Sequence, residues 1–270
     1  MLAAAVVVIL GVTIFLILRP QRPERLTGCE AGPDGQGFQL STGQAAIAAT
    51  IAGVANKRHL PARAVAVAYA AALQESKLTN LPYGDLDSVG VFQQRPSEGW
   101  GSAHQLQNPI YATGRFFDAL TAVSGYQKLP IDVAAQDVQH SADGTAYAQY
   151  APAASAMASA FTGTVPHAVW CSYADPPGKP HLAAASRGLN SAFGLQARPG
   201  SAPRFLAIPV TGNPQGWAVA AWLVAHADTY GITSVRYDGY QWRGFTGLGH
   251  WTRPPPRASA PATAASVEFG

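Results

Sequence analysis

The sequence predicts a mainly helical domain followed by a small α+β domain, behind an N-terminal transmembrane helix. Three observations lead to this prediction. An uninterrupted apolar run lies near the first residue, alanine-rich segments with helical spacing follow it, and strand-like runs flank an apolar helix further on. The chain has 270 residues, which is long enough for two modest domains with cores of their own.

The apolar run covers residues 2–18 and reads LAAAVVVILGVTIFLIL, without a single charge. Its 17 residues are the short limit for a helix that spans a membrane. A cleaved signal peptide is the alternative, but no basic region precedes the run and no A-x-A cleavage site is evident. We therefore expect an uncleaved membrane anchor over residues 1–18.

Residues 19–37 are rich in proline, glycine and charge, and we expect a linker there. Three arginines in this segment would, by the positive-inside rule, place the domains in the cytoplasm. Cys29 and Cys171 argue for the opposite side, because a disulfide between them would persist only in an oxidising compartment. Two unpaired thiols are the alternative. We expect the domains on the extracytoplasmic side of the cell membrane.

The formal net charge of +3 comes mostly from the segment next to the apolar run. Residues 1–25 hold three arginines and one glutamate, which leaves 15 basic and 14 acidic residues beyond them. A nearly neutral chain offers no electrostatic reason to bind nucleic acid. We expect no nucleic-acid partner.

The predicted first domain covers residues 38–165. Helices are expected, in order, at residues 43–57, 62–76, 109–123, 131–140 and 145–162. Pro61 is well placed for the first turn of the second helix. Residues 79–107 show little periodicity and many turn residues, and ordered loops of that length are uncommon unless they are functional.

The predicted second domain covers residues 166–253. It opens with a segment rich in Pro, Gly and Ser, for which no element is predicted. A strand at 204–210, an apolar helix at 215–229 and a strand at 232–238, with a further short strand at 240–242, make up the α+β unit. Residues 254–270 are expected to be a flexible tail.

Glu75 is the most informative single residue. It follows the helical segment ARAVAVAYAAAL, in which Arg63 is the only charge. Burial and the negative end of a helix dipole both penalise a charged carboxylate, so a carboxyl in this place is a candidate general acid. A glutamate that simply emerges into solvent at a helix end is the alternative.

The loop after Glu75 reads YGDLDSVGVFQQRPSEGWG over residues 83–101. Its side chains suit sugar binding, because amides offer hydrogen bonds and aromatic rings offer stacking faces. The amides are Gln93 and Gln94, and the rings are Tyr83 and Trp100. An ordinary polar loop with aromatic anchors is the plainer interpretation.

Three segments in this order, ALQES, DSVGVFQQRPSEGWG and NPIYATGRFF, resemble the lysozyme-like transglycosylase domain of actinobacterial cell-wall proteins. Lytic transglycosylases show Glu-Ser at a helix end, then Ser-x-Gly-hydrophobic-x-Gln, then a helix with glycine near an aromatic residue. The matching positions are Glu75-Ser76, Ser88 to Gln93, and Gly114 before Phe116. The resemblance implies a lysozyme-like catalytic domain over residues 38–165. The cysteines that flank it fit the secreted form of this group, which implies a disulfide between them.

The resemblance also implies an activity, that of a lytic transglycosylase or lysozyme-type muramidase. Glu75 would protonate the glycosidic oxygen between N-acetylmuramic acid and N-acetylglucosamine in peptidoglycan, and would then act as base on the muramyl 6-hydroxyl or on water. One of Asp85 and Asp87, with Asp87 preferred, is the candidate for stabilising positive charge on the sugar or for positioning water. A turn-stabilising role is the alternative for each of them. The glycan-binding candidates are Ser88, Gln93, Gln94, Tyr83, Trp100 and Tyr147. No cofactor is implied.

One segment departs from the classical family, whose Ala-Tyr-Asn-x-Gly motif shapes the sugar cleft. The nearest equivalent here is Val138-Gln139-His140-Ser141, followed by AYAQY with Tyr147 and Tyr150. Each of these tyrosines fits either the cleft or the core.

Residues 204–251 are similar to a domain of wall proteins related to zinc D-alanyl-D-alanine peptidases. The region in which those peptidases carry metal ligands, near residues 191–210, contains no histidine or aspartate here. The remaining candidates match no zinc-site spacing; they are His226, Asp228, Asp238 and His250. We expect a metal-free, peptidase-like domain.

Together these observations predict a membrane-anchored glycosidase whose partner and substrate are the glycan strands of peptidoglycan. The rival hypothesis is a catalytically weak wall-binding or scaffold protein that keeps the lysozyme-like fold. Glu75 itself favours the enzyme.

Overall fold

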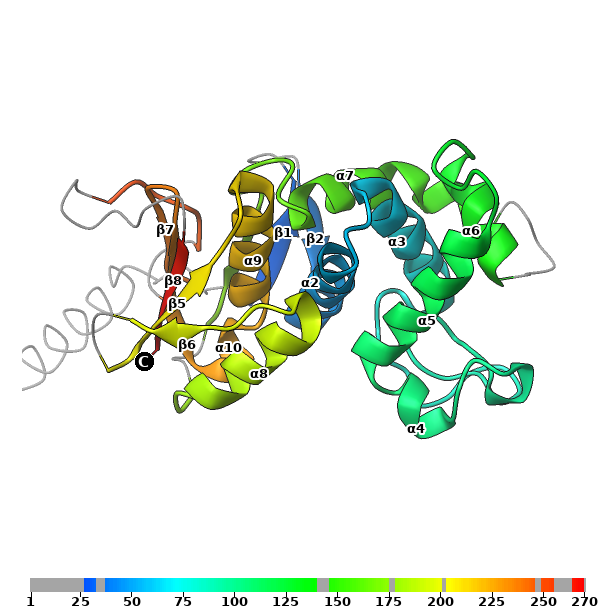
Figure 1. Cartoon of the computed structure of the whole chain (residues 1–270), viewed down its shortest axis with the longest axis horizontal. Coiled ribbons are helices and arrows are strands. Elements are labelled where there is room, and N and C mark those ends of the chain that lie inside the picture. Colours follow the sequence, from blue (N-terminus) through cyan, green and yellow to red (C-terminus); the bar gives the residue numbers. More distant parts are fainter. Residues whose placement is uncertain are drawn as a thin grey trace, which may run out of the picture.

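The computed structural model describes residues 27–32, 37–139, 146–174, 178–200, 203–245, 249–254 and 264–269. These residues form nine α-helices and two antiparallel sheets, a mixed α/β architecture (Figure 1). Within them no helix is both long and apolar enough to cross a membrane. The predicted anchor at residues 1–18 lies outside the described residues.

All five helices expected in the first domain are confirmed. They are α2 (Thr42–Lys57), α3 (Ala62–Ser76), α5 (Pro109–Ala122), α6 (Ile131–Gln139) and α7 (Ala151–Phe161). A capping box between Ser41 and Gln44 starts α2, and Asn108 caps α5 just ahead of Pro109. The last predicted helix begins later than expected, because the 3₁₀ turn η2 (Ala148–Tyr150) precedes α7.

Helix α2 lies at the centre of the molecule, with α3 and α5 on one side and α8 (Leu182–Phe193) and α9 (Asn213–Ala225) on the other (Figure 1). Its buried face consists mostly of alanine, and small side chains let neighbouring helices approach closely. One continuous apolar core runs through both predicted domains as a result. Helix α8 was not predicted, because its flanking Pro- and Gly-rich sequence indicated a loop.

The first sheet has the order β2-β1-β3, with β2 at Phe38–Leu40, β1 at Gly28–Ala31 and β3 at Val169–Ser172. Cys29 and Cys171 stand opposite each other on β1 and β3 and form a disulfide, which confirms their predicted pairing. The prediction of a linker over residues 19–37 is wrong at β1. This short segment is a strand because it pairs with β3, and the paired cysteines are 142 residues apart in the sequence.

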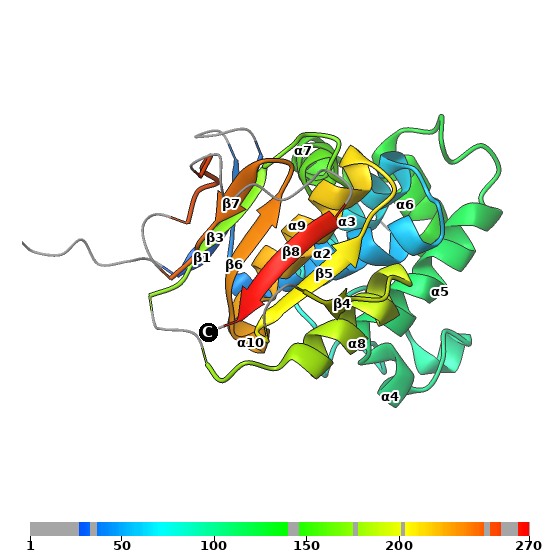
Figure 2. The same cartoon turned by 60° about the vertical axis from the view of Figure 1, so that its left-hand side comes forward.

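The second sheet has the order β4-β5-β8-β6-β7, all antiparallel (Figure 2). Its strands are β4 (Arg198–Pro199), β5 (Phe205–Pro209), β6 (Ile232–Tyr237), β7 (Tyr240–Trp242) and β8 (Ala264–Phe269). Strands β5 and β6 both run antiparallel to β8 and are therefore parallel to each other. Helices α9 and α10 (Ala227–Tyr230) make the crossover between them, which defines a split β-α-β unit.

The prediction of a flexible tail over residues 254–270 is wrong for β8. This strand lies in the middle of the sheet, hydrogen-bonded on both edges. Ala265 and Val267 are buried, while Ala264 and Ser266, which alternate with them, are only partly buried. That alternation is the signature of a strand, but it spans too few residues to stand out beside a Pro-rich segment.

Candidate active site at the end of helix α3

Glu75 lies in the last turn of α3, where its side chain is half-buried. The helix is held from inside by Tyr69, whose hydroxyl donates to the Ala48 carbonyl of α2 at 2.7 Å. Directly after Ser76 the chain turns sharply, because Lys77 and Leu78 both adopt positive φ and the Leu78 N–H bonds back to Ala72 O. The turn stops the helix and leaves the Glu75 carboxylate at the border between core and solvent.

The structure brings Glu75 together with Tyr147. The Tyr147 hydroxyl donates a 2.6 Å hydrogen bond to Glu75 Oε1, and the tyrosine ring is fully buried. Tyr147 is the only residue in the described part of the chain that hydrogen-bonds this carboxylate. Oε1 is thereby fixed, and Oε2 is left for another partner. Because its ring is buried in the core, Tyr147 orients Glu75 through the hydroxyl and offers no face for stacking on a sugar.

The loop after α3 is hydrogen-bonded to the ends of two helices, α3 and α6. Ser76 Oγ donates to Val91 O at 2.7 Å, and Gln139 Nε2 at the end of α6 donates to Phe92 O at 2.8 Å. Gly90 takes φ +82°, and a Cβ there would lie 2.5 Å from Leu106 O. Glycine is therefore required at that position. Gln139 belongs to the segment that stands in place of the classical cleft motif, but its hydrogen bond to the loop was not predicted.

The predicted glycan-binding residues of the loop divide into inner and outer positions. Ser88 and Gln94 are buried, and Gln94 Nε2 donates to Ala112 O, so both shape the loop from within. Gln93 Nε2 donates to the Tyr83 and Gly90 carbonyls. Tyr83 itself is 69% exposed and is free to meet a ligand.

Asp87 is engaged in holding the loop. Its carboxylate accepts hydrogen bonds from Ser97 N at 2.8 Å, Ser97 Oγ at 2.9 Å and Arg95 Nε at 3.2 Å. The hydrogen bonds from Ser97, together with that from Arg95, lower the pKa of the Asp87 carboxyl. This geometry gives Asp87 the turn-stabilising role, with both carboxylate oxygens engaged within the loop.

Lys77 and Tyr150 fasten η2 beside the candidate site. The Lys77 ammonium contacts the Tyr150 hydroxyl and lies 4.6 Å from the centroid of the ring. The Lys77 carbonyl accepts a 2.9 Å hydrogen bond from Gln44 Nε2 on α2. These contacts hold in place the 3₁₀ turn that follows Tyr147.

Trp100 lies elsewhere on the loop, against α5. It lines a surface hollow to which Glu75 does not contribute. Among the described residues, Tyr147 is thus the one predicted glycan-binding residue that hydrogen-bonds Glu75, and Trp100 lines a different hollow.

The histidines and acidic residues of the second half do not gather into a site. In the described ranges, no three His, Cys, Asp or Glu side chains cluster in a way that could hold a metal ion. His226 ends α9, where its Nδ1 bonds to Trp222 O at 2.8 Å and its ring stacks on the Trp222 indole. Burial lowers the pKa of His226 to about 4, so it is neutral at pH 7.

No protein-family model matches this chain, and no curated protein sequence does. A half-buried carboxyl with one oxygen fixed, and with no hydrogen-bond partner at the other among the described residues, can give a proton to a bound substrate and take one back.

Proposed function

We propose that this protein is a membrane-anchored glycosidase that cleaves the bond between N-acetylmuramic acid and N-acetylglucosamine in peptidoglycan. The observation that carries the proposal is the pairing of Glu75 with Tyr147. The pair sits at the helix end where the lysozyme-like resemblance requires a catalytic acid, under a loop fastened to α3 and α6.

In the proposed reaction Glu75 gives its proton to the glycosidic oxygen. The bond from that oxygen to C1 of the muramyl residue breaks, and the N-acetylglucosamine hydroxyl leaves. The Glu75 carboxylate then takes the proton of the muramyl 6-hydroxyl, while the oxygen of that hydroxyl attacks C1. This intramolecular attack gives a 1,6-anhydro end. Attack by water instead gives a reducing end. Tyr147 holds the carboxylate throughout, and no second carboxylate is required by the anhydro route.

The proposed compartment is the extracytoplasmic side of the membrane. The disulfide between Cys29 and Cys171 supports this, because such bonds persist in oxidising surroundings. The apolar run at residues 2–18 would supply the anchor.

The test is to incubate the purified full chain with insoluble peptidoglycan and to analyse the released muropeptides by mass spectrometry. Anhydro-muramyl products from the wild type and none from Glu75→Gln are expected. Glutamine keeps the shape of the side chain and an oxygen for Tyr147, so the variant should fold. Asp137→Asn, which changes an exposed carboxylate on α6, is the matched control and should retain activity.

Two other outcomes are informative. Reducing ends that depend on Glu75 would identify a hydrolase. No release by the wild type, with the protein still retained on the insoluble wall, would refute the enzyme and favour the wall-binding alternative.

A further inference from the structure

A hollow of about 640 Å³ lies between the second half of the loop and helix α5. Its lining residues are Glu98, Gly99, Trp100, Arg115, Asp118 and Ala119. This volume is in the range of pockets that bind small molecules. Glu75 and Tyr147 are not part of the lining, so the hollow is separate from the candidate active site.

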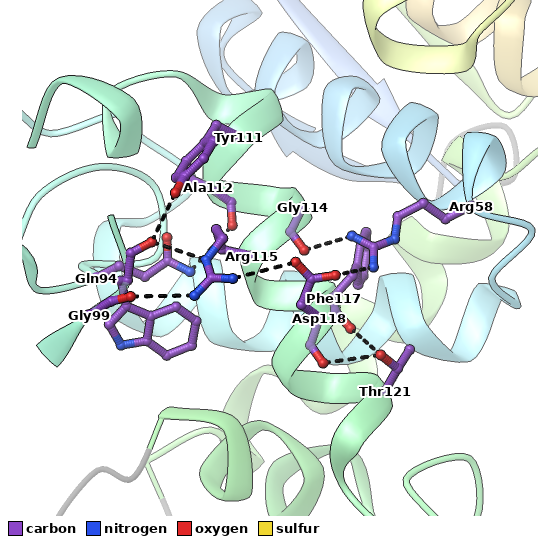
Figure 3. Close-up of polar contacts among 11 residues, drawn as sticks. Arg58, Gln94, Gly99, Tyr111, Ala112, Gly114, Arg115, Phe117, Asp118 and Thr121 are labelled. Atoms are coloured by element: carbon purple, nitrogen blue, oxygen red, sulfur yellow. Dashed lines mark hydrogen bonds and ion pairs between the residues drawn. The ribbon is translucent and has the colours of Figure 1, made fainter. Parts of the chain in front are cut away.

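Arg115 fixes the loop to the helix on one side of the hollow. Its Nε donates to Trp100 O at 3.1 Å and its Nη2 to Gly99 O at 3.4 Å (Figure 3). The Tyr111 hydroxyl also reaches Trp100 O, at 3.4 Å. The wall that carries Trp100 is therefore held by α5 before any ligand arrives, which reduces the entropy lost on binding.

Asp118 stands between two arginines. One carboxylate oxygen contacts the Arg58 guanidinium, and the other lies 3.8 Å from Arg115 (Figure 3). Arg58 is itself held by a 2.7 Å hydrogen bond from Nη1 to Gly114 O. The Asp118 side chain remains 51% exposed, so its oxygens can still accept hydrogen bonds from a ligand.

The charges around the hollow cancel locally. Asp118 pairs with Arg58 and Arg115, and Glu98 pairs with Arg95 at 2.6 Å. An anionic ligand would have to compete with carboxylates already in place for each guanidinium. A neutral ligand with several hydroxyl or amide groups can instead use the donors and acceptors side by side.

Trp100 adds an apolar face to this polar lining. The residue is partly buried against the core and also lines the hollow. The C–H face of a pyranose ring can pack on an indole while its hydroxyl groups bond to charged side chains around it. The combination of one aromatic face with paired charges matches a sugar better than it matches a peptide or an anion.

We propose that this hollow binds a neutral saccharide unit of a glycan chain, as a second binding site apart from Glu75. The inference goes beyond the proposed function, because binding here requires no chemistry at Glu75. A glycan strand held at this site would stay attached to the protein whether or not it is cut elsewhere.

The test follows the indole N–H signals of the full chain labelled with ¹⁵N-tryptophan, by NMR, during titration with tetra-N-acetylchitotetraose. The detergent must lack a sugar headgroup, since such a headgroup would compete for the site. The chain has six tryptophans, and Trp100→Phe assigns the relevant signal. The Trp100 signal should shift saturably in the wild type and equally in Glu75→Gln.

Ala119→Arg fills the hollow, and Ala122→Arg is its matched control on the exposed face of α5. Binding read at Trp100 should weaken about tenfold or more in Ala119→Arg, a loss of roughly 1.4 kcal/mol, and stay unchanged in Ala122→Arg. The other indole signals report that each variant is folded. A Trp100 signal that does not move at saturating sugar, or wild-type affinity in Ala119→Arg, would overturn the proposal. The titration measures binding and not cleavage. Its result therefore stands whether or not the protein has the proposed enzyme activity.

Discussion

Tyr147 and Glu75 are 72 residues apart in sequence, and the Tyr147 hydroxyl donates a 2.6 Å hydrogen bond to Glu75 Oε1. The phenol ring is fully buried, so packing fixes the direction from which the hydroxyl approaches. A carboxyl held in this way needs no rearrangement before it meets a substrate, which is the geometric basis of an efficient acid or base.

Tyr147→Phe should therefore lower kcat about 10- to 100-fold and leave KM nearly unchanged. The phenylalanine ring fills the same space, while the orientation of Glu75 is lost. Initial rates of muropeptide release at several peptidoglycan concentrations measure both constants. Tyr150→Phe, which alters the neighbouring hydroxyl at Lys77, is the control and should keep most of kcat. Equal kcat values for Tyr147→Phe and the wild type would show that the Tyr147 contact is structural only.

Asp87→Asn should loosen the loop around residues 88–99. The carboxylate accepts three hydrogen bonds from Ser97 and Arg95, and an amide cannot accept them all with the same geometry. Faster hydrogen exchange of loop amides, measured by mass spectrometry, is the expected result. Asp85→Asn, an exposed neighbour, should leave exchange unchanged.

The same loop should loosen on acidification. The pKa of Asp87 is lowered in the folded protein, so its stabilising contribution is present above its ordinary pKa of 3.8 and is lost as the pH falls through the lower folded value. Exchange in Asp87→Asn should not show this acid dependence. Identical exchange in the wild type and Asp87→Asn at neutral pH would contradict the role given to Asp87.

His226 should make the folded protein sensitive to acid. Its pKa falls from 6.5 to about 4 on folding, so the unfolded chain binds the proton more readily between these values. The contribution of neutral His226 to the free energy of unfolding is therefore fully present above pH 6.5. It decreases as the pH falls towards 4, by up to about 3 kcal/mol in total. Urea unfolding at pH 7 and pH 4.5 measures the difference. His226→Phe keeps the stacking on Trp222 and should show a smaller difference; an unchanged one would assign the acid sensitivity to other groups.

Strand β8 should be essential to the second sheet. Val267 is 1% exposed and faces the core, so Val267→Ala should lower the free energy of unfolding by roughly 2 kcal/mol. Ser266→Ala, on the other face of the same strand, should change it by no more than about 0.5 kcal/mol. Urea unfolding followed by tryptophan fluorescence distinguishes the two. Equal, small effects would mean that β8 contributes little to the fold.

The sequence predicted the helices well because their signals are local. The spacing of Ile47, Ile51 and Val54 and the position of Pro61 are enough to place α2 and α3 to within a residue or two. Strand β8 was missed because its place depends on β5 and β6, which no local pattern reveals. Residues 28–31 gave no strand signal for the same reason, since only the pairing with β3 makes them a strand.

The candidate site was predictable only in part. Glu75 stood out because a carboxylate ends an almost uncharged helix, and the loop after it was recognisable by composition. The partner Tyr147 was expected to bind glycan, and its contact with Glu75 depends on how the chain returns after α6. The hollow beside Trp100 combines the loop with side chains from α5, so spacing along the sequence gives no indication of it.

The disulfide also determines how the chain carries mechanical load. Cys29 and Cys171 enclose the helices from α2 to α7, so tension applied to the two flanking segments passes through the sulfur–sulfur bond and bypasses everything between. Glu75 and its loop lie inside this covalent ring and stay unloaded while the bond is intact. Reduction would expose up to roughly 480 Å of additional extended chain to the pulling force. A single backbone cut within the ring would likewise leave both pieces joined as one molecule.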